Sequence, residues 1–458
     1  MTTPVSAARL IGEFVSTFRL GSPPQQIVEA VGRVLLDTYS VAVAGRTEDA
    51  YTLALRYARS GALAAPGRAA RDWGSGEVLP VEMAALTNAV AGHVLDYDDV
   101  TSPLRGHPSV AMIPALIGLA EAMDADGTEF IAAYVAGFEV ICKLARAIAV
   151  KHYAQGWHST SSIGVIGAAV ACARLLGLDA QRTTHAVGLA VAQASGCRAN
   201  FGTHAKSFQA AHSNAAGLRA ALLAAEGFDA AEAALDGPFG YMELYAHNEE
   251  LLPQLQALGQ HPLEIVTSGI EVKKYPLCYA THLTLDGVLD LRASHQVTLA
   301  DVESVHIRAS AGALTPLIHL RPQTGLEAKF SMQYAVTAAL LDGSVTLSSF
   351  TDEAVRRPDA QAFFSRVTTD DKHDGPTFPR WSEIEIALRG GQRLEKRVDV
   401  LRGSARAPLT SQELETKVRD CFSWGGAALD VDQVIKGALS LDQVSMRRWL
   451  DLAIPKNH

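Results

Sequence analysis

The sequence lacks the motifs that mark several large classes of protein. Five cysteines are scattered along its 458 residues and form no CxxC pair. This spacing gives little support for a zinc site or an iron–sulfur cluster, and it favours a reducing compartment. The chain also has no GxGxxG after a strand, no GxxxxGKS or GxxxxGKT, and no GxSxG. We therefore expect neither a nucleotide cofactor nor the serine nucleophile of the α/β-hydrolases.

Long apolar runs and concentrated positive charge are also missing. No uninterrupted apolar run reaches the roughly 18 residues that a membrane span requires, and the N-terminus has no basic region followed by a long apolar one. The formal net charge is −9, with no block or stripe of lysine and arginine. Membrane and nucleic-acid partners are therefore not expected, and we interpret the chain as a soluble cytoplasmic protein.

Helical periodicity dominates the first 262 residues. The chain is 48% hydrophobic, which is ample for a large core. In Ile27–Ala44 most apolar residues recur at spacings of three and four, as in a helix with one buried face. Pro108 suits the first turn of a helix, and Thr128 and Asp179 suit N-caps. Helices are expected at 8–19, 27–44, 51–59, Pro80–Tyr97, Pro108–Met123, Glu129–Ile148, from Ser159 or Thr160 to Leu176, from Asp179 to about Ser195, and at His204–Ala225. Residues 1–262 are therefore predicted to form an all-helical domain.

The pattern changes near residue 262. Alternating or β-branched segments predict strands, and Gly390-Gly391 between two of them predicts a hairpin. Strands are expected at Glu264–Lys274, Val302–Ala309, Val367–Thr369, Glu383–Leu388 and Arg393–Val400, with helices at Thr281–Arg292 and Glu327–Leu341. We predict an α+β domain over 263–405 and a return of helices 406–458 to the first domain. The fold class is thus mainly α, with a smaller α+β domain.

The polar stretch Ala91–Met112 interrupts apolar surroundings and holds several possible acids and bases. Asp96 stands near the end of a predicted helix, and His107 follows in a turn that also carries Arg105. Helical spacing would place His93 and Asp96 on one helix face. Burial of such groups moves their pKa values, as active sites require, although acidic runs at helix ends are commonly solvated loops.

Three further segments bring polar groups into apolar sequence. His158 directly precedes a predicted helix, where backbone N–H groups bind anions and the helix dipole lowers the pKa of an imidazole. Lys206 enters a strongly apolar helix, so it either reaches to water or is held for an anionic ligand. Lys273-Lys274 opens the second domain, and lysine pairs are usually surface charge.

Taken together, these segments resemble the MmgE/PrpD superfamily, which contains 2-methylcitrate dehydratase, cis-aconitate decarboxylase and iminodisuccinate epimerase. The motifs that carry the resemblance are LLDTYSVAVAG (35–45), HxxDYDD (93–99), GHPS (106–109), GWHST (156–160), TxxK (203–206), KxYPxCxxTH (273–282) and GLEAKFSMQY (325–334). The resemblance implies a large helical domain built from both ends of the chain and a smaller α+β lid. It also implies a homodimer that needs no metal and no organic cofactor.

The resemblance further implies a site at the interface of the two domains. Carried over position by position, its main residues are Asp96, His107, His158, Lys206 and Lys273. Secondary substrate-binding candidates are Arg105, Gln209, Lys274 and His282. Of the pair Lys273-Lys274, Lys274 is the less essential lysine. His282 either lines the site or supports it.

Two positions depart from the family pattern. Val100 stands where decarboxylase-like members carry a threonine, and one extra residue separates it from His107. Gln209 replaces a common histidine, and an amide cannot shuttle a proton as an imidazole does. These changes leave the fold prediction intact and the exact reaction open.

We therefore expect a cofactor-independent lyase, a dehydratase or a decarboxylase, that acts on a small di- or tricarboxylate. His107 and His158 would form the acid–base pair, Lys206 and Lys273 would bind substrate carboxylates, and Asp96 would orient or charge a histidine. An epimerase acting on an iminodisuccinate-like dicarboxylate is the first alternative. A non-catalytic carboxylate-binding protein is the second, because fold alone does not determine function.

Overall fold

The computed structural model describes residues 6–61, 68–246 and 251–454. The chain forms two units. The helical unit comprises Met1–Val94, Asp98–Glu271 and Glu413–His458, and the α+β unit comprises Leu95–Tyr97 and Val272–Gln412. Three residues of the polar stretch thus belong to the second unit, whereas the residues on both sides belong to the first.

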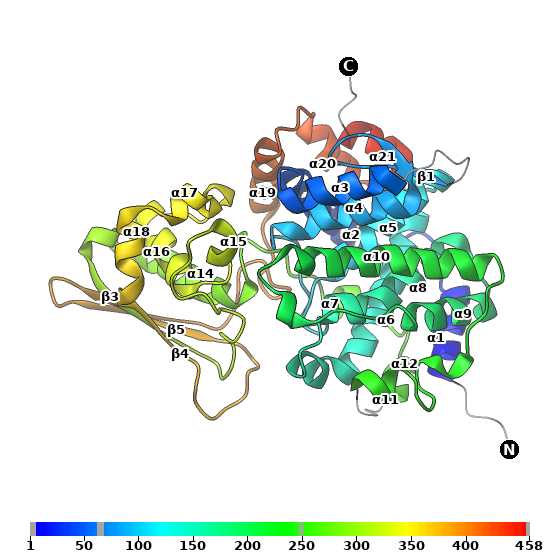
Figure 1. Ribbon diagram of the computed structural model, residues 1–458, viewed down its shortest axis with the longest axis horizontal. Coiled ribbons are helices and arrows are strands. Elements are labelled where there is room, and N and C mark those ends of the chain that lie inside the picture. The colour runs from blue at the N-terminus through cyan, green and yellow to red at the C-terminus, as the bar shows by residue number, and fades with distance from the viewer. Residues whose placement is uncertain (1–5, 62–67, 247–250, 455–458) are drawn as a thin grey trace. The chain divides into compact units, whose positions relative to one another are not determined.

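Tightly packed helices build the helical unit (Figure 1). Its longer helices are α1 (Ala7–Thr17), α2 (Gln25–Gly45), α3 (Asp49–Gly61), α4 (Val81–Val94), α5 (Pro108–Met123), α6 (Gly127–Ala154), α8 (Gly164–Leu176), α9 (Ala180–Val191), α10 (His204–Ala225), α19 (Ser411–Trp424), α20 (Val431–Leu439) and α21 (Met446–Ala453). The shorter elements are strands β1 (Ala69–Arg71) and β2 (Val78–Pro80), helices α7 (Ser159–Ser162), α11 (Tyr241–Ala246), α12 (Leu252–Leu255) and α13 (Glu264–Thr267), and the 3₁₀ helices η1 (Arg198–Asn200), η2 (Glu232–Ala234) and η7 (Leu441–Gln443).

Several helix boundaries follow the capping signals in the sequence. Pro108 opens α5, and the Asp179 side chain accepts a hydrogen bond from the Arg182 backbone N–H at the start of α9, as predicted. Helix α10 has the bounds expected from its periodicity. Close packing needs small residues at crossings: a Cβ at Gly167 of α8 would lie 2.2 Å from Ile141 Cδ1 of α6. Local sequence and helix packing therefore agree over most of this unit.

Several predicted helix boundaries are wrong, among them the end of α6, which runs to Ala154 rather than Ile148. Helix α4 ends at Val94 rather than Tyr97, because Asp96 has a left-handed backbone (φ 51°) that takes the chain out of the helix. Helix α6 begins at Gly127 with Asp126 as N-cap, so Thr128 lies inside its first turn. The helix predicted to run to Leu176 is divided, and its N-cap is His158 rather than a hydroxyl residue.

One stretch within the described residues, Ser159–Leu176, meets the length and composition criteria of a membrane-spanning helix. In the structure, 94% of it is buried inside the protein. Its apolar character is therefore explained by packing among the other helices, chiefly α6 and α10.

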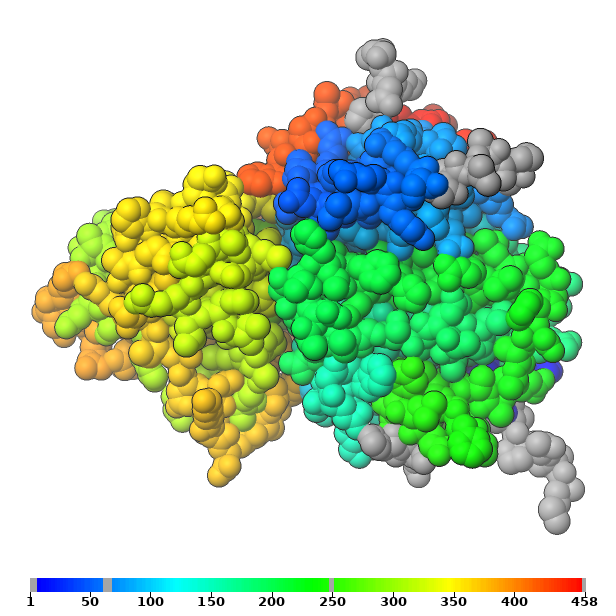
Figure 2. Space-filling model, in the orientation of Figure 1, coloured from blue at the N-terminus to red at the C-terminus, as the bar shows by residue number. Residues whose placement is uncertain are grey.

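Helices from the C-terminal end of the chain pack on the N-terminal part of the helical unit. The Tyr39 hydroxyl of α2 donates to the Ala453 carbonyl at 2.6 Å, and the Tyr39 and Trp449 rings meet edge to face. Lys417 of α19 forms a buried ion pair with Asp37 of α2 at 2.5 Å. Figure 2 shows the orange C-terminal segment beside the blue N-terminal helices on the surface of this unit.

A four-stranded sheet organises the α+β unit. The strands are β3 (Val302–Ala309), β4 (Val367–Asp370), β5 (Ser382–Leu388) and β6 (Arg393–Val398), in the order β4-β3-β5-β6. The helices are α14 (His282–His295), α15 (Gly325–Ala328), α16 (Met332–Asp342), α17 (Asp352–Val355) and α18 (Pro358–Phe363), with 3₁₀ helices η3 (Tyr279–Thr281), η4 (Leu299–Asp301), η5 (Leu347–Phe350) and η6 (Phe364–Arg366). Strands β3 and β4 are parallel and the other two pairs are antiparallel, so the predicted β5–β6 hairpin is confirmed.

Helices α14, α16 and α18 lie on one face of this sheet (Figure 1). Their apolar sides share a core with the inward side chains of the strands, among them Val305, Ile307 and Ile386. A Cβ at Gly287 would lie 2.4 Å from Ile384 Cδ1, so glycine lets α14 approach β5 closely. This confirms the predicted fold class of a mainly α protein with a smaller α+β part.

Two predictions for this part of the chain are wrong. Glu264–Lys274 is no strand: Glu264–Thr267 forms α13, and only an isolated bridge joins Glu271 to Val100. The Glu264 carboxylate is held by Lys143 and Arg146 of α6, which ties this segment to the helical unit. The helix predicted at Glu327–Leu341 is divided into α15 and α16.

Candidate functional site

Four helix ends bring together a group that we call the histidine cluster: His93, Asp98, His107, His158, Lys206 and Gln209. All six residues are buried and belong to the helical unit. His93 ends α4, Asp98 follows in the loop, and His107 and His158 are the N-caps of α5 and α7. Lys206 and Gln209 lie in the first turns of α10, which packs against α4, α5 and α7. Three of the five predicted main residues, His107, His158 and Lys206, therefore lie in one cluster.

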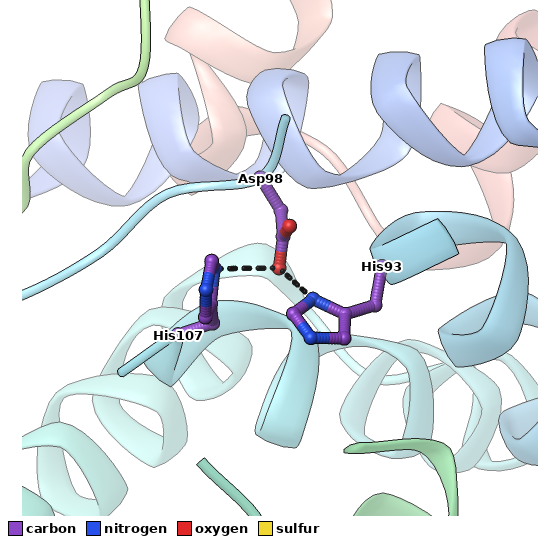
Figure 3. A group of neighbouring side chains, drawn as sticks. All are labelled: His93, Asp98 and His107. Atoms are coloured by element: carbon purple, nitrogen blue, oxygen red, sulfur yellow. Dashed lines mark hydrogen bonds and ion pairs between the residues drawn. The ribbon is translucent and has the colours of Figure 1, made fainter. Parts of the chain in front are cut away.

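The Asp98 carboxylate is the centre of this cluster (Figure 3). Its Oδ2 atom lies 2.8 Å from His93 Nδ1 and 3.2 Å from His107 Nδ1. Burial alone would raise the pKa of Asp98, but the two facing imidazoles outweigh it and hold that pKa well below its usual range. Asp98 is therefore an anion that two histidine rings share through one oxygen.

Lys206 reaches the opposite side of the His93 ring. Its Nζ atom lies 2.9 Å from His93 Nε2, although the two residues are 113 positions apart in sequence. Burial lowers the pKa of His93 to about 4, and the charges of Lys206 and His107 add to that effect against the opposing influence of Asp98. His93 is therefore neutral near pH 7.

His158 has an amide partner instead of a carboxylate. Its Nδ1 atom lies 2.8 Å from Gln209 Oε1, and the Gln209 amide nitrogen donates to the Cys197 carbonyl at 3.1 Å. The pKa of His158 is lowered well below its usual value, first by burial and then by the nearby charge of Lys206. The predicted direction is confirmed, with burial as the largest cause and the charge of Lys206 as the next.

An aromatic ring covers part of the cluster. Phe201 meets the His158 ring edge to face at 5.0 Å, and the Lys206 ammonium lies 5.5 Å from the centre of the same phenyl ring. Phe201 thus supplies an apolar surface beside a base and a cation, which lowers the local dielectric and strengthens their electrostatic action.

A second carboxylate anchors the loop that carries Asp98. The Asp99 side chain accepts hydrogen bonds from the backbone N–H and the hydroxyl of Ser109, and that hydroxyl lies 2.7 Å from the Tyr134 hydroxyl. Burial raises the pKa of Asp99 well above its usual value, and the charge of Asp37 adds to the effect. The loop is therefore fixed to the first turn of α5, next to His107.

The other two predicted main residues meet within the α+β unit. Lys273 Nζ donates to the Asp96 carbonyl at 2.6 Å and lies 3.1 Å from Asp96 Oδ1. Lys329, which the sequence analysis did not select, donates to the carbonyls of Leu95 and Pro276 at 2.6 and 2.8 Å. Two buried lysines therefore bind the segment Leu95–Tyr97 within this unit. Asp96 is not on a helix face with His93, so the pairing predicted from helical spacing is wrong.

The secondary candidates lie in different surroundings. Arg105 is half-buried in a loop with a left-handed backbone, and Lys274 is also half-buried, with its carbonyl accepting from the Tyr97 hydroxyl. His282 is buried, and its Nε2 atom lies 3.2 Å from the Leu277 carbonyl. Val100 exchanges two backbone hydrogen bonds with Glu271, which joins the Asp98 loop to the end of the segment Asp98–Glu271.

The site residues predicted from the sequence did not include His93 or Asp98. The available signal was the HxxDYDD motif, in which His93 and Asp98 are five residues apart. That spacing places two side chains on different faces of a continuous helix. The partnership becomes visible only because α4 ends between them.

The ligand atoms of His93, Asp98 and His107 lie within 4.8 Å of one another, as a metal site would require. However, the two imidazoles both face one carboxylate oxygen, and an ammonium group lies 2.9 Å from the other nitrogen of His93. A divalent cation bound there would face that positive charge. The donor set therefore fits a hydrogen-bonded network better than a metal centre.

The chain belongs to the MmgE/PrpD family. The model of the MmgE/PrpD N-terminal domain matches residues 9–254, and that of the C-terminal domain matches residues 275–441. This confirms the resemblance noted from the motifs, and each domain model falls largely on one of the two structural units.

Particular relatives are cis-aconitate decarboxylases. The chain is 27% identical to the enzyme of that name from Homo sapiens over 413 residues, which cover 88% of this chain and 84% of that protein. It is 29% identical to the one from Mus musculus, with 86% and 82% covered. The one from Aspergillus terreus is 24% identical, with 86% and 85% covered.

Proposed function

We propose that this MmgE/PrpD enzyme, a lyase, decarboxylates a small unsaturated tricarboxylate such as cis-aconitate. The observation that carries the proposal is the histidine cluster, in which two imidazoles face one buried carboxylate and an ammonium group contacts the far nitrogen of one of those rings. The names of the relatives support the reaction and the substrate class.

The chemistry of cis-aconitate explains what such a cluster must supply. When the carboxylate on the saturated arm leaves as CO₂, its C–C bond breaks and that electron pair forms a new C=C bond. The original π pair moves to the carbon next to another carboxylate, and that carbon takes one proton. The enzyme must therefore deliver a proton and stabilise negative charge spread onto a carboxylate.

Each member of the cluster has a proposed part in these steps. His107 delivers the proton, because the Asp98 anion beside its ring stabilises the imidazolium form. Lys206 stabilises the negative charge that develops on the substrate. His158, neutral in a buried position, is the second acid–base group. On the strength of the family resemblance, Lys273 keeps its predicted role as a substrate-binding residue.

Incubation of the purified protein with cis-aconitate and other polycarboxylates, read by mass spectrometry, tests the proposal. We expect a product lighter by one CO₂, and we expect His107→Ala to lose about 10²- to 10⁴-fold in rate, as for removal of a general acid. His295→Ala, which changes an exposed histidine on α14, is the matched control and should retain full rate.

Other outcomes select the alternatives. Loss of one water would indicate a dehydratase, and deuterium uptake from heavy water without loss of mass would indicate an epimerase. Saturable binding of tricarboxylates with no turnover of the panel would indicate a non-catalytic binding protein. Each of these results would overturn the decarboxylase proposal.

We also propose that the protein acts without a metal or organic cofactor, as a cytoplasmic homodimer. The ammonium of Lys206 beside His93 supports the first part, because it supplies positive charge within the cluster. The family resemblance supports the rest. Activity that survives exhaustive chelation and light scattering at twice the chain mass of 48.7 kDa are the expected results.

A further inference from the structure

His93 has two charged neighbours, one at each ring nitrogen. Its Nδ1 atom lies 2.8 Å from the Asp98 carboxylate, and its Nε2 atom lies 2.9 Å from the Lys206 ammonium. The side chain is 1% exposed and packs edge to face on the His107 ring at 4.5 Å. The ring therefore lies between the groups that the proposed reaction uses and solvent does not reach it.

The chemistry of its neighbours assigns the protons on this ring. A carboxylate only accepts hydrogen bonds and an ammonium group only donates them. Nδ1 must therefore carry hydrogen and donate to Asp98, while Nε2 must be unprotonated and accept from Lys206. The other neutral tautomer would turn a lone pair toward the anion, and an imidazolium would turn an N–H toward the ammonium. Only one of the three protonation states satisfies both contacts.

We propose that His93 is a positioning residue that bridges Asp98 and Lys206 in a single tautomer and takes no proton during turnover. It holds the Lys206 ammonium in place and keeps one oxygen of Asp98 aimed at His107. This inference rests on the proposed function, in which Lys206 and His107 are the working groups. The low pKa of His93, about 4, agrees with a ring that stays neutral.

The bridge also explains why one carboxylate oxygen serves two rings. When His107 gives up its proton, Asp98 loses a cationic neighbour but keeps the N–H of His93. The carboxylate is then neither unpartnered nor free to rotate. A buried carboxylate left without a partner would be strongly destabilised. His93 thus keeps the site assembled between one turnover and the next.

Two substitutions separate a bridge from an acid–base group. In His93→Gln, an amide retains one donor for Asp98 and one acceptor for Lys206 but cannot titrate. In His93→Leu, both contacts are lost. We expect His93→Gln to keep kcat within about tenfold and to leave the pH profile unchanged, and His93→Leu to lower kcat by about 10²- to 10³-fold. His295→Gln is the control, and far-UV and near-UV circular dichroism verify folding.

Equal losses in folded His93→Gln and His93→Leu would overturn the proposal, because they would mean that the ring itself transfers protons. The pH profile is decisive here, since Asp98, His107, His158 and Lys206 are the other titratable groups that face the ring and all remain in both variants.

A measurement without substrate separates this inference from the proposed function. The ¹⁵N spectra of histidine-labelled protein, with His93 assigned by its absence in His93→Gln, report the protonation of each ring nitrogen. We expect a protonated Nδ1 and an unprotonated Nε2 from about pH 5.5 to 8, since an ordinary histidine titrates near 6.5. Titration of His93 within that range would overturn the proposed role of His93 even if cis-aconitate is the substrate. If cis-aconitate does not react, a non-titrating His93 would still support that role.

Discussion

Each of the two units buries a lysine that the sequence marked as functional, and the two differ in their partners. In the helical unit, Lys206 contacts the unprotonated nitrogen of a neutral imidazole. In the α+β unit, Lys273 contacts the carboxylate and the carbonyl of Asp96. The contact of Lys206 is with a neutral ring, whereas the Asp96 carboxylate carries a charge opposite to that of Lys273.

The difference teaches that burial of a lysine does not define its role. A buried ion pair is costly to break, because removing one member leaves an uncompensated charge. The positive charge of Lys206, which contacts a neutral imidazole, lowers the pKa of the neighbouring His93 and His158 side chains. The comparison therefore predicts that replacing Lys273 lowers stability, whereas replacing Lys206 lowers the catalytic rate.

Replacement of Lys273 should have the largest effect, and on stability. Lys273→Met leaves the Asp96 carboxylate buried without its cation, so we expect the free energy of unfolding to fall by about 3–5 kcal/mol. Denaturant titration measures it, with Lys274→Met as the matched control at the neighbouring, less buried position. A Lys273→Met protein of full stability that has lost substrate binding would instead make Lys273 chiefly a binding residue.

Replacement of Lys206 should act on catalysis. We expect Lys206→Met to lower kcat by about 10²- to 10³-fold, as for loss of one charge-stabilising group. Because its charge lowers the pKa of His158, the acidic limb of the pH–rate profile should also move to higher pH. Steady-state kinetics across pH measure both effects. A limb that stays in place would contradict the electrostatic link between the two groups.

Replacement of Gln209 should move a pKa with a smaller effect on rate. In Gln209→Glu, a carboxylate next to Nδ1 stabilises the imidazolium form of His158, so the pKa of His158 rises. A higher pH is then needed to deprotonate His158, so the acidic limb of the pH profile of kcat/KM should move to higher pH. Gln209→Met removes the hydrogen bond without adding charge and should not produce this shift. An identical profile for both variants would show that His158 does not control this limb.

The smallest effect is expected at Asp99. Burial raises the pKa of Asp99 well above its usual value, so Asp99→Asn, which places a neutral group of the same shape there, should be tolerated. The free energy of unfolding should change by less than about 1.5 kcal/mol, the range of a single hydrogen bond. Asp98→Asn, by contrast, removes the anion between two imidazoles and should lower kcat by about 10²-fold or more. Denaturant titration and kinetics of the two neighbouring variants test this pair, and equal behaviour would contradict it.

Much of the fold could be predicted because its signals are local. The apolar spacing of Ile27–Ala44 and the proline at 108 act within a few residues, and the helices there follow them. Gly390-Gly391 likewise predicts the turn between β5 and β6. Prediction failed at Glu264–Lys274, where ion pairs with α6, more than 100 positions earlier, decide the conformation.

The site was predictable in part for the same reason. His158 and Lys206 could be selected because each places a polar group where the surrounding sequence is apolar. His93 could not, because its partners depend on where α4 stops and on a residue of α10. The spacing rule that joined His93 to Asp96 holds only within a continuous helix, and the left-handed backbone of Asp96 breaks that condition.

By itself, the sequence determined the family, the two structural classes within the chain and the residue types available for catalysis. These follow from periodicity, composition and motifs, which are properties of neighbouring residues. The tertiary structure decided which imidazole faces an anion, which faces an amide, and which lysine contacts a carboxylate. Protonation depends on partners from different helix ends, such as His93 and Lys206, which are 113 positions apart, and only packing of the helices brings them together.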